Sequence, residues 1–204
     1  MSKKVDWLSE FDRIGARKTG EIWKMASGKY SGVNFDMWRL YENPDMYSRA
    51  CNALLRKSGF RIVQSPDTWI IGPERDGIAM ALELARQSGT HAAFTSKTMF
   101  SGAALKEFKL LDKARVLLVT DVITTGSSLV KVAAAIQQSG GTIVRKVLTF
   151  VNRSNLKKLC LFPHADQKCN HHEFDIISLV EVNEPGWSCM HEAMQHSRSR
   201  GEFV

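Results

Sequence analysis

The sequence has few of the features that mark disulfide-rich, membrane-spanning or disordered proteins. Its 204 residues include four cysteines and five prolines, with no internal repeat or low-complexity tract. Because the cysteines are widely separated, we expect reduced thiols rather than a disulfide framework. The first residues, MSKKVDWLSEF, contain no apolar stretch of signal-peptide length, and no apolar run reaches the roughly 20 residues that span a bilayer. We therefore expect a soluble, cytoplasmic protein with no membrane partner.

What the chain does contain is the composition of an ordinary globular domain. Apolar residues make up 44% of it and charged residues 24%, and 204 residues suffice for one domain with a sizeable core. The formal net charge of +7 favours acidic partners, either phosphorylated small molecules or nucleic acid. Against nucleic acid, the sequence has no arginine-rich run, no helix-turn-helix signal and no basic strand interleaved with aromatic residues.

Short apolar runs alternate with segments of helical period along most of the chain. Leu129, Val132 and Ile136, for example, share one helical face, and Gly140 ends that helix. The predicted strands are residues 68–73, 91–97, 114–120, 142–151 and 176–182, and the predicted helices are residues 42–59, 76–89 and 129–136. Strands that alternate with helices in this way predict an α/β fold, with a parallel sheet of about five strands covered by helices on both faces.

The stretch VLLVTDVITTGSSL, residues 116–129, joins one predicted strand to the next helix. In open α/β sheets, ligands bind at the carboxyl ends of parallel strands. The hydroxyls of this stretch and the N–H groups that open the helix can donate to a phosphate, and Gly126 lets the backbone approach it closely. The carboxylate of Asp121 can accept hydrogen bonds from ribose hydroxyls. The pattern therefore indicates a site for a phosphorylated sugar.

A simpler interpretation of the same stretch is an ordinary strand-to-helix loop capped by serine and threonine. Capping needs one such residue, whereas four surround Gly126 here, at positions 124, 125, 127 and 128. Neither G-x-x-x-x-G-K-[ST] nor G-x-G-x-x-G occurs, so the stretch is neither a P-loop nor the common dinucleotide-binding turn.

These residues resemble the signature of the type I phosphoribosyltransferases, in which an apolar strand and two acids lead into D-V-x-T-T-G-x-S/T. Other segments are similar to orotate phosphoribosyltransferases in particular, and together they cover most of residues 15–155: GEIWKMASGKYSGVNFD, WIIGPERDGIAMALELA, AAFTSK with LKEFKL, and TFVNRS. The resemblance implies the type I phosphoribosyltransferase fold, with a central parallel sheet flanked by helices and a small N-terminal hood. It implies one phosphoribosyltransferase domain over residues 1–204, with the hood in 1–40, the core in 41–155 and a C-terminal segment in 156–204.

The activity that the resemblance implies is transfer of ribose 5-phosphate from phosphoribosyl pyrophosphate (PRPP) to orotate, a step of pyrimidine biosynthesis. The products are orotidine 5′-monophosphate and pyrophosphate, and Mg²⁺ is the expected cofactor. The resemblance also implies a homodimer and a mobile loop, about residues 98–108, that closes over the site and excludes water.

The resemblance also implies roles for individual residues. Asp121 and Lys97 are candidate catalytic residues, Asp121 is a candidate indirect ligand of Mg²⁺, and Thr124 and Arg153 are candidate base-binding residues. The candidate PRPP-binding residues are Thr120, Asp121, Val122, Ile123, Thr124, Thr125, Gly126, Ser127, Ser128, Arg75, Asp76 and Lys97. Departure of pyrophosphate develops oxocarbenium character, so cations on the leaving group suit this chemistry. A planar guanidinium suits the edge of a pyrimidine, although Arg153 and Lys97 can also be solvated surface charges.

The sequence departs from the family pattern at Thr120, where the family has an acid. Threonine keeps a hydroxyl but removes one carboxylate from the expected ribose contact. Two alternatives therefore remain open besides an orotate enzyme. One is a phosphoribosyltransferase for another purine or pyrimidine base, and the other is a PRPP-binding regulator of nucleic acid without turnover.

One group of residues lies outside the resemblance. Residues of types that ligate zinc gather near the C-terminus: Cys160, His164, Cys169, His171, His172, Cys189 and His191. Their spacing is irregular and no C-x-x-C pair occurs. The two interpretations are a structural zinc site and a polar loop whose histidines face water.

Overall fold

The computed structural model describes residues 5–25, 28–59, 67–95, 114–161 and 173–183. The chain divides into two units. One contains Met1–Tyr47 with Val182–Val204, and the other contains Ser48–Glu181.

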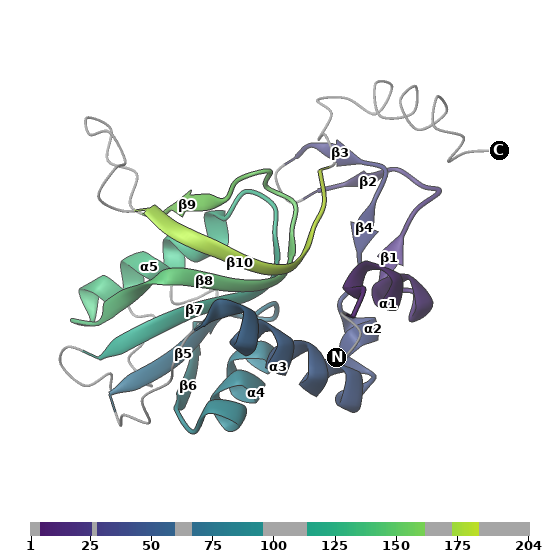
Figure 1. Cartoon of the computed structure of the whole chain (residues 1–204). Coiled ribbons are helices and arrows are strands. Elements are labelled where there is room, and N and C mark those ends of the chain that lie inside the picture. The colour runs from purple at the N-terminus through teal and green to yellow at the C-terminus, as the bar shows by residue number, and fades with distance from the viewer. Residues whose placement is uncertain (1–4, 26–27, 60–66, 96–113, 162–172, 184–204) are drawn as a thin grey trace. The chain divides into compact units, whose positions relative to one another are not determined.

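A six-stranded sheet forms the centre of the larger unit (Figure 1). Its strands lie in the order β6-β5-β7-β8-β10-β9, and all neighbours are parallel except β9, which pairs antiparallel with β10. The strands are β5 (Thr68–Pro73), β6 (His91–Thr95), β7 (Arg115–Ile123), β8 (Thr142–Asn152), β9 (Lys158–Cys160) and β10 (Glu173–Glu181). The sheet therefore has five parallel strands and one short antiparallel strand at its edge.

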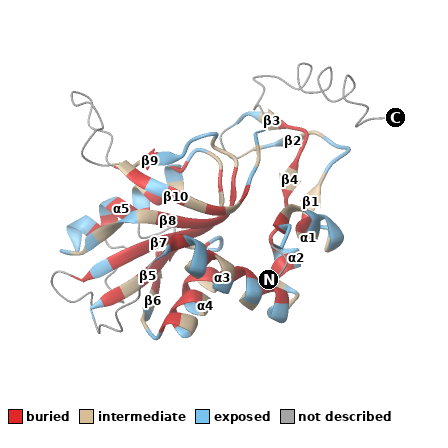
Figure 2. Ribbon diagram, viewed as in Figure 1, coloured by how far each residue is buried: buried red, intermediate tan, exposed pale blue. Residues whose placement is uncertain are grey.

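The central strands are apolar on both faces because helices cover both. In β7, every residue from Val116 to Thr120 is buried, and Figure 2 shows the burial concentrated in the middle of the sheet. Continuous apolar runs of this kind are typical of parallel strands that do not face water.

Three helices flank the sheet, α3 (Pro44–Ser58), α4 (Ile78–Ser88) and α5 (Ser127–Gln138). Figure 1 shows α3 and α4 on one side of the sheet and α5 on the other. The apolar face of α5 packs in one buried cluster with alternate residues of the strands, among them Leu118 of β7 and Val147 of β8. On the opposite side, Lys146 of β8 donates to the carbonyl of Ser58 in α3 over 2.6 Å.

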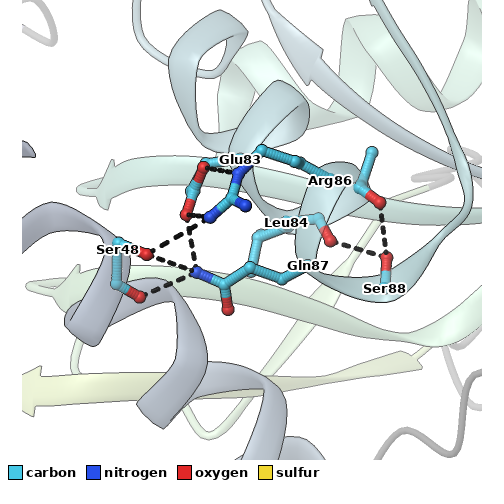
Figure 3. A network of polar contacts seen from close by, with 7 residues as sticks. Ser48, Glu83, Leu84, Arg86, Gln87 and Ser88 are labelled. Atoms are coloured by element: carbon cyan, nitrogen blue, oxygen red, sulfur yellow. Dashed lines mark hydrogen bonds and ion pairs between the residues drawn. The ribbon is translucent and has the colours of Figure 1, made fainter.

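Polar side chains join α3 to α4 (Figure 3). The Glu83 carboxylate accepts hydrogen bonds from Arg86 and Gln87, all three on α4. The Gln87 amide also donates to the carbonyl and hydroxyl of Ser48 on α3, over 2.8 and 3.1 Å. We call these four residues the α3–α4 clamp. Because α4 follows β5 after the four residues 74–77, the clamp holds the helix that comes next after that strand.

The smaller unit has its own short elements. Its helices are α1 (Trp7–Arg13) and α2 (Trp38–Tyr41), and its strands are β1 (Arg17–Lys18), β2 (Trp23–Lys24), β3 (Tyr30–Ser31) and β4 (Asn34–Phe35). β1 pairs with β4 and β2 with β3, both antiparallel. Phe11, Val33 and Leu40 are buried within it. The N-terminal segment predicted as a hood falls in this unit, and a place over the base stays a prediction.

The predicted strands and helices of the larger unit are present within a few residues. The largest differences are at β7, which extends three residues further than expected, to Ile123, and at β10, which begins at Glu173. β9 was not predicted. It has only three residues, too few for a period of two to appear in the sequence.

Candidate active site

The strand order places the carboxyl ends of β5 and β7 at a topological switch point. β5 lies between β6 and β7, so the chain moves to one edge of the sheet after β5 and to the other edge after β7. Open parallel sheets bind ligands outside the strand ends at such a point. The turn at residues 74–77 follows β5 and the turn at 124–126 follows β7. The Asp121 N–H donates to the Asp76 carbonyl over 3.2 Å, so the first turn contacts the strand that carries the second.

Asp121 is held at several atoms. Its N–H donates to Asp76, and its carbonyl accepts a hydrogen bond from the Thr149 hydroxyl over 2.9 Å. Its carboxylate accepts from the N–H of Val122 over 2.6 Å. The side chain is half-buried. The orientation of the carboxylate is therefore restricted.

Thr120 lies in a different environment, although it precedes Asp121 in the chain. It is only 2% exposed, and its cross-strand partner is Thr149 of β8. Successive residues of a strand point to opposite faces, so Thr120 lies on the face of Leu118, which packs in the α5 cluster. This burial favours a structural role for Thr120, and its contact with PRPP stays a prediction.

The turn after β7 leads into the N-terminus of α5. Thr125 and Ser127 are exposed, whereas Thr124 and Ser128 are half-buried. The Ser127 N–H donates to the Thr125 hydroxyl over 3.4 Å, which in turn donates to the Ser127 hydroxyl over 3.2 Å. The first N–H groups of a helix have no acceptor within the helix, and the helix dipole favours an anion there. This turn has the groups that an anion-binding helix N-terminus needs.

Gly126 is required for packing as well as for close approach of a ligand. Its φ of 75° lies in the left-handed region that favours glycine. A Cβ at this position would lie 2.5 Å from Cδ1 and 2.8 Å from Cδ2 of Leu159, the buried leucine of β9. Any larger residue here therefore also disturbs the contact with β9, so its effects are not confined to ligand binding.

The turn after β5 is unusually tight. A Cβ on Gly72 would lie 2.5 Å from the carbonyl oxygen of Gly77, and a Cβ on Gly77 would lie 2.6 Å from the Cα of Gly72. The Gly77 N–H donates to the Pro73 carbonyl over 2.9 Å. Arg75 has a φ of 70°, which is uncommon for a residue with a side chain. Such backbone strain is typical of ligand-binding turns, and Arg75 and the adjacent Asp76 are exposed.

Arg153 directly follows β8, and its position is coupled to β7. Its N–H donates to the Ile123 carbonyl over 2.7 Å. The side chain of the buried Asn152 holds the following loop: its amide donates to the Leu156 carbonyl, and its carbonyl oxygen accepts from the N–H and hydroxyl of Ser154. The structure therefore brings the backbone of Arg153 to the end of the strand that carries Asp121.

Other predicted site residues lie outside the described residues. These are Lys97, the loop at 98–108, and all of the predicted zinc ligands except Cys160. Cys160 is disulfide-bonded, which contradicts the expectation that its thiol is reduced and leaves no free thiolate to ligate zinc. Cys51 is a buried free cysteine. Among the described residues, no group of three or more His, Cys, Asp or Glu side chains is placed to hold a metal.

Sequence reasoning missed two polar residues of the site, Thr149 and Asn152. Thr149 is one threonine inside the apolar run VLTFV, and nothing local distinguishes its hydroxyl from an ordinary strand residue. Asn152 ends the same strand, where an asparagine that bonds its own loop is common. Their partners on β7 and in the loop become visible only when the strands are paired.

Comparison with known proteins gives the same assignment as the motif. Residues 39–161, which include both turns and Arg153, match the phosphoribosyl transferase domain. The chain belongs to the phosphoribosyltransferase family. An orotate phosphoribosyltransferase of Desulforamulus reducens is 32% identical over 147 residues, which cover 72% of this chain and 74% of that protein. An orotate phosphoribosyltransferase of Maricaulis maris is 31% identical over 147 residues, which again cover 72% of this chain and 74% of that protein.

Solved structures of phosphoribosyltransferases share the fold. The orotate phosphoribosyltransferase of Aeropyrum pernix has a TM-score of 0.64 and 24% identity, with 85% of this chain and 92% of that chain covered. The adenine phosphoribosyltransferase of Thermoanaerobacter pseudethanolicus has a TM-score of 0.61 and 18% identity, with coverages of 86% and 99%. The predicted family and fold class are therefore confirmed for this phosphoribosyltransferase.

Proposed function

We propose that this phosphoribosyltransferase transfers ribose 5-phosphate from PRPP to orotate. The observation that carries the proposal is the convergence at the switch point, where the N–H of Asp121 bonds the carbonyl of Asp76 and joins the turn after β5 to the strand that leads into the second turn. Relatives at 31–32% identity that are named orotate phosphoribosyltransferase support orotate as the acceptor.

The 5-phosphate of PRPP binds at the turn after β7 in this proposal. The N–H groups and hydroxyls at residues 124–128 donate to the phosphate oxygens, and the N-terminus of α5 adds its positive dipole end. Asp121 accepts hydrogen bonds from the ribose hydroxyls. The turn at residues 74–77 faces the pyrophosphate, where Arg75 supplies a cationic side chain.

The reaction exchanges one bond at the anomeric carbon for another. The bond from C1 of the ribose to the pyrophosphate oxygen breaks, and a bond from C1 to a ring nitrogen of orotate forms. Pyrophosphate leaves with the bonding electron pair, and the ring nitrogen loses its proton. Because C1 becomes electron-poor as pyrophosphate leaves, the carboxylate of Asp121 near the ribose and cations near the leaving group both favour the transition state.

The donor set suits Mg²⁺ bound mainly through substrate. This ion is commonly held by one or two carboxylates together with substrate phosphates and water, so a single protein carboxylate beside bound PRPP is compatible with it. Asp121, half-buried at the end of β7, is the residue that would hold the ion indirectly. When bound, Mg²⁺ would neutralise charge on the departing pyrophosphate.

The test of the proposed function is pyrophosphate release from PRPP in the presence of Mg²⁺, screened over orotate, uracil and purine bases. Release with orotate and formation of orotidine 5′-monophosphate are the expected results. Release with another base alone would assign a different acceptor. PRPP binding without release on any base would instead favour a PRPP-dependent regulator.

Arg153 tests the base side of the site. We expect Arg153→Ala to lower kcat/KM for orotate about ten- to hundredfold, because a hydrogen bond to a charged group contributes about 1.5–3 kcal/mol. The KM for PRPP should change much less, since the guanidinium is assigned to the pyrimidine. Steady-state kinetics with each substrate varied in turn measure both quantities.

Arg145→Ala is the matched control for Arg153→Ala. Arg145 is an exposed arginine of β8, near the end of the strand opposite to Arg153, so its removal changes the net charge equally without touching the site. Equal increases in KM for orotate and PRPP in the Arg153 variant would count against a base contact.

In the described part of the chain, none of the helices combines the length and the apolar character needed to cross a membrane. Three further features stay predictions, because they are expected from the family resemblance alone. They are cytoplasmic localisation, a homodimer and a catalytic role for Lys97. Sedimentation of the purified protein tests the homodimer.

A further inference from the structure

Three buried hydroxyl side chains form a row across the centre of the sheet. Thr120 of β7 pairs with Thr149 of β8, and Thr149 pairs with Ser178 of β10. Their exposed fractions are 2%, 0% and 1%. The neighbouring rows on this face are apolar, with Leu118 paired to Val147 on one side. Hydroxyls in such surroundings are unfavourable unless they form hydrogen bonds, so the contacts of this row are informative.

Thr149 contacts the main chain of two strands. Its hydroxyl lies 2.9 Å from the carbonyl oxygen of Asp121 on β7 and 3.1 Å from that of Val151 on its own strand. A hydroxyl has one hydrogen, and both acceptors lie within reach of it. By contrast, the Ser178 hydroxyl has no hydrogen-bond partner within the described part of the chain. Members of one row therefore differ in whether they contact the active site.

The two carbonyls near Thr149 belong to the segments that carry the proposed substrate contacts. Asp121 is the proposed ribose ligand, and its N–H already bonds the turn after β5. Val151 is two residues before Arg153, whose N–H bonds Ile123 of β7. Without the hydroxyl, the carbonyl oxygens of Asp121 and Val151 would both lose a hydrogen-bond donor, which weakens the link between the ends of β7 and β8.

We propose that Thr149 is a positioning residue of the transferase site, which holds the main chain of Asp121 in register with the segment that carries Arg153. The inference rests on the proposed function, because the parts assigned to Asp121 and Arg153 come from it. Thr149 does not touch substrate. It acts on PRPP binding through the orientation of the Asp121 carboxylate.

The test compares Thr149→Val with Thr149→Ser. Valine has nearly the shape of threonine and removes only the hydroxyl, so we expect the sheet to keep its melting temperature within a few degrees. The Kd for PRPP with Mg²⁺, measured by calorimetry, should rise about five- to tenfold, the effect of one buried hydrogen bond. Serine restores the donor and should return the Kd to near the wild-type value.

Ser178→Ala is the control from the same row. It also deletes a buried hydroxyl from this face of the sheet, but one that forms no hydrogen bond within the described residues, so the Kd for PRPP should not change. An unchanged Kd in Thr149→Val, or an equal loss in Thr149→Val and Ser178→Ala, would overturn the proposal. A loss of melting temperature that accounts for the weaker binding would also overturn it.

The binding measurement keeps this inference distinct from the proposed function. If the wild type binds PRPP but does not use orotate, the choice of acceptor fails. The PRPP affinities of the Thr149 and Ser178 variants, compared with that of the wild type, still test the positioning role of Thr149. A wild type that does not bind PRPP would overturn both.

Discussion

At the scale of single residues, the important contrast is between Thr120 and Asp121. Asp121 is half-buried and bonded to Asp76, Val122 and Thr149, whereas Thr120 is buried on the α5 face. From the sequence, an acid at position 120 would restore a second carboxylate to the ribose site. The structure favours a different result, because a carboxylate there would enter the apolar interior.

We expect Thr120→Asp to lower the free energy of unfolding by about 3 kcal/mol at neutral pH, since it buries a charge without a partner. The affinity for PRPP should not increase. Burial raises the pKa of the introduced carboxyl above its ordinary value. The loss of stability caused by the charge should therefore be complete above that raised pKa. It should disappear as the pH falls below about 3.9, the pKa of the carboxyl in the unfolded chain. Denaturant unfolding across this pH range measures it.

Thr120→Asn is the control, because asparagine has the shape of aspartate without its charge. The two variants should converge in stability at low pH and differ at neutral pH. If Thr120→Asp instead gained affinity for PRPP only with Mg²⁺ and kept its stability, the side chain at 120 would face the ligand.

At the scale of elements, the α3–α4 clamp supports the helix that follows the turn at residues 74–77. Hydrogen bonds from Arg86 and then from Gln87 (Figure 3), together with a smaller effect of Ser48, lower the pKa of Glu83 to about 2. The Glu83 side chain is 15% exposed but that of Arg86 is 67% exposed, so solvent screens the ion pair and its contribution is modest.

Glu83→Gln should lower the free energy of unfolding by about 0.5–1 kcal/mol at neutral pH. Because the folded pKa of Glu83 lies below its ordinary value, the clamp stabilises the fold fully above about pH 4.5 and loses this contribution as the pH falls toward 2. Wild type should therefore lose more stability than the variant in this window. Thermal unfolding at several pH values compares them.

Glu42→Gln provides the control for the clamp. Glu42 pairs with Arg39 over 3.1 Å on the surface, with side chains 62% and 49% exposed. Removing this pair should leave the stability nearly unchanged at neutral pH. Parallel stability curves for Glu83→Gln and wild type from pH 5 to about 2 would contradict the stabilising role assigned to the clamp.

At the scale of the whole molecule, the net charge of +7 suits a substrate with several phosphates. Screening shortens the range of this attraction from about 30 Å at 0.01 M salt to about 10 Å at 0.1 M. We expect the KM for PRPP to rise severalfold over this range and the KM for orotate, which carries fewer charges, to rise less. Initial rates at fixed Mg²⁺ measure both, and parallel salt dependence for the two substrates would exclude charge attraction as the cause.

Much of the candidate site was predictable because its residues are close together in the chain. The motif from Val116 to Leu129 and the turn at 74–77 each combine a strand end, a glycine and a helix start within a few residues. Arg153 was identified by its resemblance to a known segment. Thr149 and Asn152 were not predicted, because their relevant partners lie on another strand or depend on how a loop closes.

The sequence by itself determined the order of strands and helices in the larger unit, because apolar period, caps and glycines act over short distances in the chain. It also determined the family, because the motif is contiguous. Only the tertiary structure decided that β5 lies between β6 and β7, that Thr149 lies beside the carbonyl of Asp121, and that Leu159 packs against Gly126. These depend on strand pairing between distant segments. A shift of one residue in the register would move every side chain of a strand to the other face.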